Sequence, residues 1–151
     1  MTVDHATLDR AGIAALIPQA GASCLLERLL RWDAGSILCA SRTHLDPANP
    51  YRRAGTLGAL VGIEYGLQAA ALHGAMAAGG RRQPAGRVAA LREVRIALTR
   101  LDDPAVGTLA VTSTLEAAEA AGLAFSFCLT AEDGRFLLGG RALIALPGGR
   151  G

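Results

Sequence analysis

GALVGIEYGLQAAALHG, which occupies residues 58–74, is the stretch that decides the fold of this chain. Apolar and very small residues recur in it at steps of three and four, as they do along one face of a helix. That face carries Leu57, Leu60, Val61, Glu64, Gln68, Ala71 and Ala75. A helix that is apolar on all sides is usually buried on all sides. The stretch therefore predicts a central buried helix that holds one carboxylate.

That carboxylate, Glu64, has two interpretations. A glutamate is rarely buried unless it is paired, so Glu64 can simply reach the surface or accept hydrogen bonds from a structural partner. Alternatively, it is a functional group, because perturbed carboxylates in apolar surroundings gather at active sites. The pattern of residues by itself leaves both interpretations open.

A second face of the predicted helix carries only very small residues: Gly58, Gly62, Gly66 and Ala70. Each glycine inside a helix costs about 1 kcal/mol relative to alanine. We therefore expect another part of the backbone, or a ligand, to pass very close to this face.

The segments around the helix read as strands and turns. Residues 24–32 and 36–43 flank an Asp-Ala-Gly turn signal and predict a hairpin. Apolar residues alternate with period two, as in antiparallel strands with one buried face, over 88–98, 109–115 and 123–129, and a last strand is expected over 136–146. A short helix is expected over 9–16, and loops or connections over 46–55, 79–86, 100–107 and 117–122. The result is an α+β fold in which a curved antiparallel sheet of about five to six strands wraps round the long central helix.

Length and charge limit what this chain can do. Its 151 residues suit one domain, 1–151, of which residues 1–8 are expected to be loose. All fifteen basic residues are arginine, which excludes the lysines of Schiff bases and of phosphate-binding P-loops. The net charge of +2, with no basic run interleaved with aromatic residues, argues against a nucleic-acid partner.

The cysteines Cys24, Cys39 and Cys128 are isolated from one another, and no C-x-x-C occurs. This spacing signals neither a zinc site nor a disulfide framework, so we expect reduced cysteines, no bound metal and a cytoplasmic protein. The N-terminal residues lack the apolar core of a signal peptide. Glu64 and Gln68 interrupt the longest apolar run, so no membrane span is expected.

Two motifs carry a resemblance to a known family. Residues 17–29, IPQAGASCLLERL, resemble the "LPHRyPfLLvDRv" opening of the β-hydroxyacyl-(acyl carrier protein) dehydratases. Residues 57–68, LGALVGIEYGLQ, resemble the "mPGvLiiEamaQ" helix of that family. The segment from the Asn-Pro-Tyr at 49–51 through the helix looks closer still to a branch of hotdog dehydratases linked to aryl-polyene pigment clusters. The resemblance covers about residues 16–146 and implies the hotdog fold, with the central helix inside a curved sheet.

The resemblance also assigns site residues. It places Glu64 on the catalytic glutamate and Gln68 on the glutamine one turn later. The histidine that normally precedes the helix and takes the α-proton would fall near Asn49 or Pro50, and neither is a base. His44 lies several residues too early, although a loop insertion could bring it to that position, and its simplest interpretation is a surface residue at a strand end. His73 follows Glu64 by nine residues, roughly 13 Å along a helix, so it is expected to stabilise the helix C-terminus rather than touch Glu64.

Dehydration of a 3-hydroxyacyl thioester requires a base, an acid and donors for the thioester oxygen. Glu64 is the expected acid, and N–H groups at the start of the helix are the expected donors. The residues expected to bind substrate are Tyr51, Gly55, Gly58 and Ala59. Arginines near the two ends of the helix, which can dock an acidic acyl carrier protein, are Arg52, Arg53, Arg81 and Arg82.

Because no base is found, three hypotheses stay open at this point. The chain is a dehydratase acting on acyl carrier protein or CoA thioesters, a hotdog thioesterase that uses Glu64, or a non-catalytic subunit paired with a histidine-bearing hotdog protein. In each case we expect a homodimer or a higher hotdog oligomer, with a hetero-oligomer as the alternative, and no cofactor.

Overall fold

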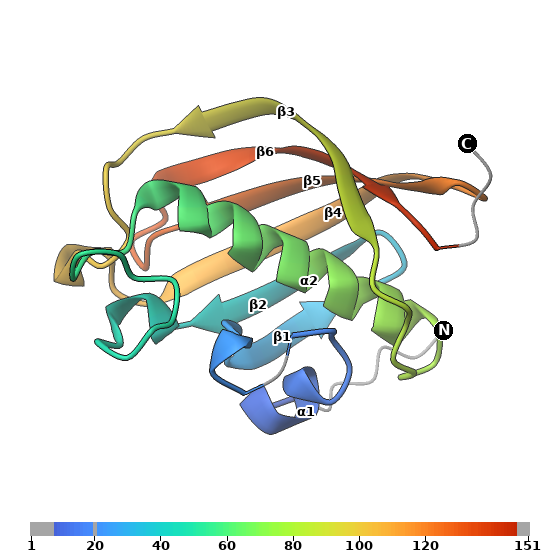
Figure 1. The fold of residues 1–151 in the computed structure, drawn as a ribbon, viewed down its shortest axis with the longest axis horizontal. Helices are drawn as coiled ribbons and strands as arrows, with labels where there is room; N and C mark the ends of the chain where they lie inside the picture. The colour runs from blue at the N-terminus through green and yellow to red at the C-terminus, as the bar shows by residue number, and fades with distance from the viewer. Residues whose placement is uncertain (1–7, 20, 148–151) are drawn as a thin grey trace.

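The computed structural model describes residues 8–19 and 21–147, and the statements below concern that part of the chain. A six-stranded antiparallel sheet curves round one long helix, with strand order β1-β2-β4-β5-β6-β3 (Figure 1). The strands are β1 (Arg28–Trp32), β2 (Ser36–Ser41), β3 (Arg87–Ile96), β4 (Leu109–Glu119), β5 (Gly122–Thr130) and β6 (Phe136–Ala145). The helices are α1 (Arg10–Ala14) and α2 (Gly62–Ala77). This architecture confirms the predicted α+β hotdog fold.

The predicted central helix is α2, which a short 3₁₀ turn, Ala59–Val61, precedes. Tyr65, Ala69 and Leu72 are completely buried in the main core. The other side of the helix is less covered than predicted, since the Leu60 side chain ahead of it is 61% exposed. The expectation of burial on all sides is therefore wrong at the start of the helix, because the sheet covers only one side.

The glycine face of α2 lies against side chains of the sheet. A Cβ atom at Gly66 would lie 2.7 Å from the Phe127 ring, and one at Gly62 would lie 3.2 Å from the Leu129 side chain. A Cβ at Gly74 would meet no heavy atom within 4 Å. The predicted close approach is therefore made by the sheet at Gly62 and Gly66, and not at Gly74.

Replacing Gly66 and Gly74 by alanine is therefore expected to change stability in opposite directions. Gly66→Ala overpacks the contact with Phe127 and should lower the free energy of unfolding by about 1–3 kcal/mol. Gly74→Ala improves helix propensity without a clash and should raise it by about 1 kcal/mol. Urea denaturation of both variants checks this. Equal changes in the two variants would show that packing against β5 does not distinguish the two glycines.

The strand boundaries differ from the predicted ones at two places. Residues 24–27, predicted as strand, precede β1, because Leu25 donates its N–H to the Gln68 side chain at 2.8 Å instead of to a neighbouring strand. Residues 117–119, predicted as a connection, extend β4 beyond a bulge after Leu115. The predicted short helix is confirmed as α1, whose N-cap Asp9 accepts the Gly12 N–H at 2.9 Å. The predicted loose segment 1–8 lies outside the described residues except for Leu8, whose carbonyl accepts the Leu29 N–H.

Strand β3 departs most from the prediction of one buried face. It forms one edge of the sheet and pairs only with β6 (Figure 1). None of its residues is fully buried, and Val88, Leu91 and Ile96 are between 41% and 46% exposed. The period-two pattern correctly predicts a strand here. Within the described chain, however, neither face of the strand is covered along most of its length.

Candidate active site

Glu64 lies in the first turn of α2, where the helix dipole favours a negative charge. Its carboxylate is half-buried and accepts from two side-chain amides. Gln19 Nε2 lies 3.3 Å, and Gln68 Nε2 3.5 Å, from its Oε1. Glu64 therefore does not project freely into solvent, and both of these partners are neutral amides.

Gln68 fixes this arrangement from within the core. Its side chain is completely buried, its Oε1 accepts the Leu25 N–H at 2.8 Å, and its Nε2 donates to the Ser23 carbonyl at 2.8 Å. One amide thus ties the segment before β1 to α2 and positions the Glu64 carboxylate one turn away. Gln19 stands where the family's opening motif has a histidine, and its Oε1 is buried without a hydrogen-bond partner among the described residues.

Glu64 and Gln19 line a cavity of about 610 Å³. This volume falls within the range of sites that bind small molecules. Its walls come from α2, the linker 79–86 and parts of strands β3 to β6. Most of the lining side chains are apolar, and they include Leu16, Leu67, Ala70, Leu115, Leu123, Phe125, Ile144 and Leu146. His73 lies in the same wall, with its Nε2 2.9 Å from the Asp33 carbonyl oxygen. That contact, and not the helix C-terminus, holds His73.

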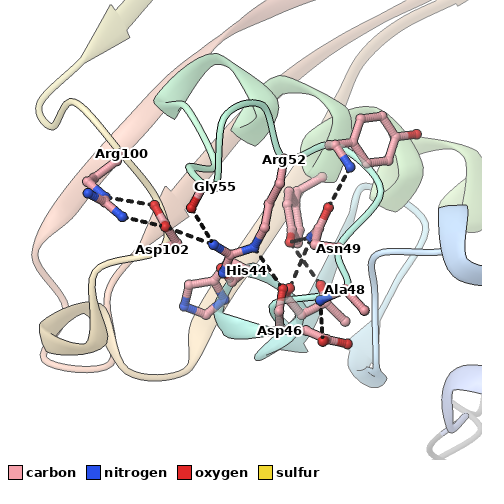
Figure 2. Close-up of polar contacts among 11 residues, drawn as sticks. His44, Asp46, Ala48, Asn49, Arg52, Gly55, Arg100 and Asp102 are labelled. Carbon is pink, nitrogen blue, oxygen red and sulfur yellow. Dashed lines mark hydrogen bonds and ion pairs between the residues drawn. The ribbon is translucent and has the colours of Figure 1, made fainter.

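The loop that enters α2 brings Tyr51 close to Glu64. Burial and the nearby negative charge of Glu64 raise the pKa of the Tyr51 hydroxyl above its ordinary value. Asn49 is buried in the same loop, where its Nδ2 donates to the Thr43 carbonyl at 3.0 Å and its Oδ1 accepts the Tyr51 N–H at 2.9 Å (Figure 2). The buried Asn49 side chain therefore supports the loop through its hydrogen bonds, and Tyr51 is the residue of this loop that lies near Glu64.

A charged clamp holds the other side of this loop. The Arg52 guanidinium donates to Asp102 Oδ2 at 3.0 Å and to the Gly55 carbonyl at 3.0 Å (Figure 2). Arg100 donates to the same carboxylate, at 2.9 Å from Nε and 2.6 Å from Nη2. The bonds from Arg100 foremost, with backbone N–H groups of Leu57 and Asp102, hold the pKa of Asp102 far below its usual range. The sequence pattern gave no sign of this clamp, since nothing in it connects Arg52 with a residue fifty positions later.

His44 is enclosed, which corrects the expectation of a surface residue. Its side chain has no solvent exposure, and neither ring nitrogen has a hydrogen-bond partner among the described residues. Burial lowers its pKa from 6.5 to about 4, so the imidazole is neutral in the folded protein at pH 7. The turn Thr43–Leu45 turns the residue inward, which its position at a strand end did not reveal.

This burial makes stability depend on pH. The unfolded chain binds a proton to His44 near pH 6.5 and the folded chain only near pH 4, so acid favours unfolding. The contribution of neutral His44 to the free energy of unfolding is complete above about pH 7. It is lost as the pH falls from about 6.5 to 4, and the total loss is about 3 kcal/mol. We expect His44→Leu to flatten the curve of unfolding free energy between these pH values. Parallel curves for the two proteins would contradict the assignment to His44.

The other predicted site residues are placed as follows. The Ala59 N–H donates to the Thr99 carbonyl at 3.1 Å, so this donor is already engaged, whereas a Cβ at Gly58 would meet only open space. Arg52 is half-buried in its clamp. Arginines that remain exposed near the two ends of α2 are Arg53, Arg81 and Arg82, and Arg82 donates to the Pro18 carbonyl beside the cavity.

Two further points concern residues 8–19 and 21–147. No group of three or more His, Cys, Asp or Glu side chains in that part of the chain is arranged to hold a metal ion. No helix there is long and apolar enough to cross a membrane.

Comparison with known proteins concerns the family and the fold. A model of the ApeP-like family, described as ApeP dehydratase, matches residues 11–147. The chain is similar to a solved structure of the dehydratase heterocomplex ApeI:P from Xenorhabdus doucetiae, with a TM-score of 0.77, 18% identity and coverage of 89% of this chain and 90% of that one.

Two other solved structures share the fold. AziG from S. sahachiroi has a TM-score of 0.56 and 17% identity over 78% of this chain and 89% of that one. A hypothetical thioesterase from Streptococcus pneumoniae TIGR4, solved with coenzyme A, has a TM-score of 0.55 and 13% identity over 82% and 87%. The search of curated proteins found no match.

Proposed function

This chain belongs to the ApeP-like dehydratase family, and from that premise we propose that it dehydrates 3-hydroxyacyl thioesters as one subunit of a hotdog pair. The observation that carries the proposal is Glu64, a half-buried carboxylate that neutral amides hold at an apolar cavity. The substrate is a thioester of an acyl carrier protein or of CoA.

In this reaction Glu64 acts as the general acid. A base removes the proton from C2, the electron pair forms the C2–C3 double bond, and the C3 hydroxyl leaves as water with a proton from Glu64. The proton taken by the base then returns to Glu64 through solvent, so no other reactant is consumed. The N–H of Gly58, an exposed residue at the start of the helix, is the proposed donor to the thioester oxygen.

The base is proposed to come from a second hotdog subunit. Among the described histidines, His44 is enclosed with its pKa lowered to about 4. His73 follows Glu64 by nine residues, roughly 13 Å along the same helix. Counting back from Glu64, the position of the usual histidine falls near Asn49 or Pro50, and neither can act as a base. The similar ApeI:P structure is a dehydratase heterocomplex, which supports a pair of unlike subunits.

One assay separates this function from its alternatives. The purified protein is incubated with a 3-hydroxyacyl carrier-protein thioester, alone and together with a histidine-bearing hotdog protein from the same gene cluster. Enoyl absorbance without release of thiol, in the mixture, is the expected result. Release of free thiol by the chain alone would establish a thioesterase, and no product in either case would contradict the proposal.

Pairing of subunits is proposed to take place along β3. The strand leaves one row of backbone groups unpaired and exposes Val88, Leu91 and Ile96, and such edges promote association. We expect light scattering at micromolar concentration to give the mass of a homodimer or larger for the chain by itself. In a mixture with the second hotdog protein we expect the mass of a hetero-oligomer. Leu91→Asp should shift the mass toward monomer. A monomeric mass for the unmodified chain, alone and in the mixture, would contradict it.

Docking of an acidic carrier protein is proposed for Arg53, Arg81 and Arg82, which are exposed. Arg52 is less suited, because its guanidinium is committed to Asp102. Since exposed charges act mainly on association rates and are screened by salt, KM for a carrier-bound substrate should rise with ionic strength.

A further inference from the structure

The cavity at Glu64 extends along α2 well beyond the proposed reacting end. From the first turn of the helix it runs past Ala70 and Gly74 to Ala77, close to the last turn. The linker closes it with Gln83, Pro84 and Gly86, and the sheet adds Leu123, Phe125 and Ile144. The space is therefore long and mainly apolar, with the carboxylate of Glu64 and the amide of Gln19 in its lining.

At Gly74, which belongs to this lining, packing within the protein gives no reason for a glycine. Gly66 is required because the Phe127 ring packs where its Cβ atom would be, and a Cβ atom at Gly62 would make a tight contact of 3.2 Å with the Leu129 side chain. At Gly74 a Cβ would meet no atom within 4 Å, and the backbone there is ordinary helix. Glycine is a poor helix former, so its presence here weakens α2 without any gain in internal packing. What the missing side chain does provide is additional width in the cavity.

We propose that this cavity binds an extended apolar acyl chain and that Gly74 sets the chain length that it admits. The proposal rests on the proposed function in one respect, since it places the thioester end of the ligand at Glu64. Ten helical residues separate Glu64 from Gly74, a rise of about 15 Å. An extended polypeptide advances about 1.1–1.2 Å per backbone bond, so an extended acyl chain needs about thirteen bonds to cover this distance. Thirteen bonds join fourteen carbons, so chains of about fourteen or more carbons reach Gly74, and chains of four to six do not.

The polar groups of the lining agree with this orientation. Gln19 lies in the lining beside Glu64, and its Nε2 donates to the Glu64 carboxylate at 3.3 Å, so both polar groups are at the same end of the cavity. His73 is the other titratable side chain in the lining, and its Nε2 is already bonded to the Asp33 carbonyl. Next to it the Phe125 ring contributes an apolar edge, with ring centroids 5.9 Å apart. A polar head near Glu64 and an apolar tail beyond it therefore match the two parts of the cavity.

The test measures binding without turnover. Tetradecanoyl-pantetheine and hexanoyl-pantetheine, made as unreactive amides, are titrated calorimetrically into the full-length protein and into Gly74→Leu. We expect the unmodified protein to prefer the longer ligand and Gly74→Leu to reduce this preference at least tenfold, because excluding two methylenes from a buried site already has that effect. Gly74→Ala should give an intermediate ratio. Gly35→Leu, which adds the same side chain in the β1–β2 turn outside the cavity lining, should keep the original ratio.

Each result decides between the possibilities. A ratio that is unchanged in Gly74→Leu, or an unmodified protein without preference for the longer ligand, would overturn the inference. If Gly74→Leu fails to fold, Gly74→Ala decides, since alanine improves the helix. Binding is measured apart from turnover, so the two proposals can fail separately. If the length preference depends on Gly74 but no dehydration is found, only the proposed function is defeated. Dehydration with a length preference indifferent to Gly74 would defeat only this inference.

Discussion

Glu64→Gln is expected to lower the rate of thioester turnover by about 10²- to 10⁴-fold while the protein stays folded. Removing a positioned acid typically has an effect of this size, because glutamine cannot donate or take up a carboxyl proton. Glutamine has nearly the same volume and still offers an oxygen to the amides of Gln19 and Gln68, so packing should change little. The measurement is turnover in the presence of the partner subunit, together with the melting temperature.

A second substitution separates chemistry from structure at this position. Glu64→Leu also removes the acceptor for Gln19 Nε2 and should lower the melting temperature as well as turnover. If Glu64→Gln keeps full turnover, the reaction takes place elsewhere. If Glu64→Gln alone causes the melting temperature to collapse, Glu64 is a structural residue.

Asp102→Asn is expected to destabilise the protein by about 3–5 kcal/mol. The Asp102 side chain is only 2% exposed and serves two guanidinium groups, and removing its charge leaves that of Arg52 partly buried and uncompensated. Because the pKa of Asp102 is lowered, its contribution is present above about pH 4 and is lost as the pH falls below its ordinary value. Urea denaturation at pH 7 measures the effect.

The matched control is Glu93→Gln, an acid-to-amide change at an exposed pair. Glu93 lies 3.9 Å from Arg141, and its side chain is 73% exposed, so the loss should be below about 1 kcal/mol. Similar losses in both variants would show that burial of the Asp102 clamp contributes nothing. Since the clamp holds the loop that carries Tyr51, turnover by Asp102→Asn should also fall at temperatures where the variant remains folded.

The sequence could predict the elements whose signal is local. Apolar spacing over 57–75 identified α2, because a helix repeats its face every few residues whatever surrounds it. Alternation identified β4 and β5 of the meander in the same way. The motif around Glu64 and Gln68 identified the pair of side chains that the structure brings within 3.5 Å of each other, because residues four apart on a helix are neighbours.

What only the tertiary structure decided are the relations between distant segments. The burial of His44, the junction of Arg52 with Asp102 and the exposure of β3 all depend on how the chain packs. The same applies to the glycines of α2, which look alike in sequence. Gly66 meets the ring of Phe127, more than sixty positions along the chain, while Gly74 meets open space. A residue's type and local spacing determine which secondary structure it can join, but its burial, partners and free space depend on contacts that bring distant positions together, and the sequence of one chain does not state those contacts.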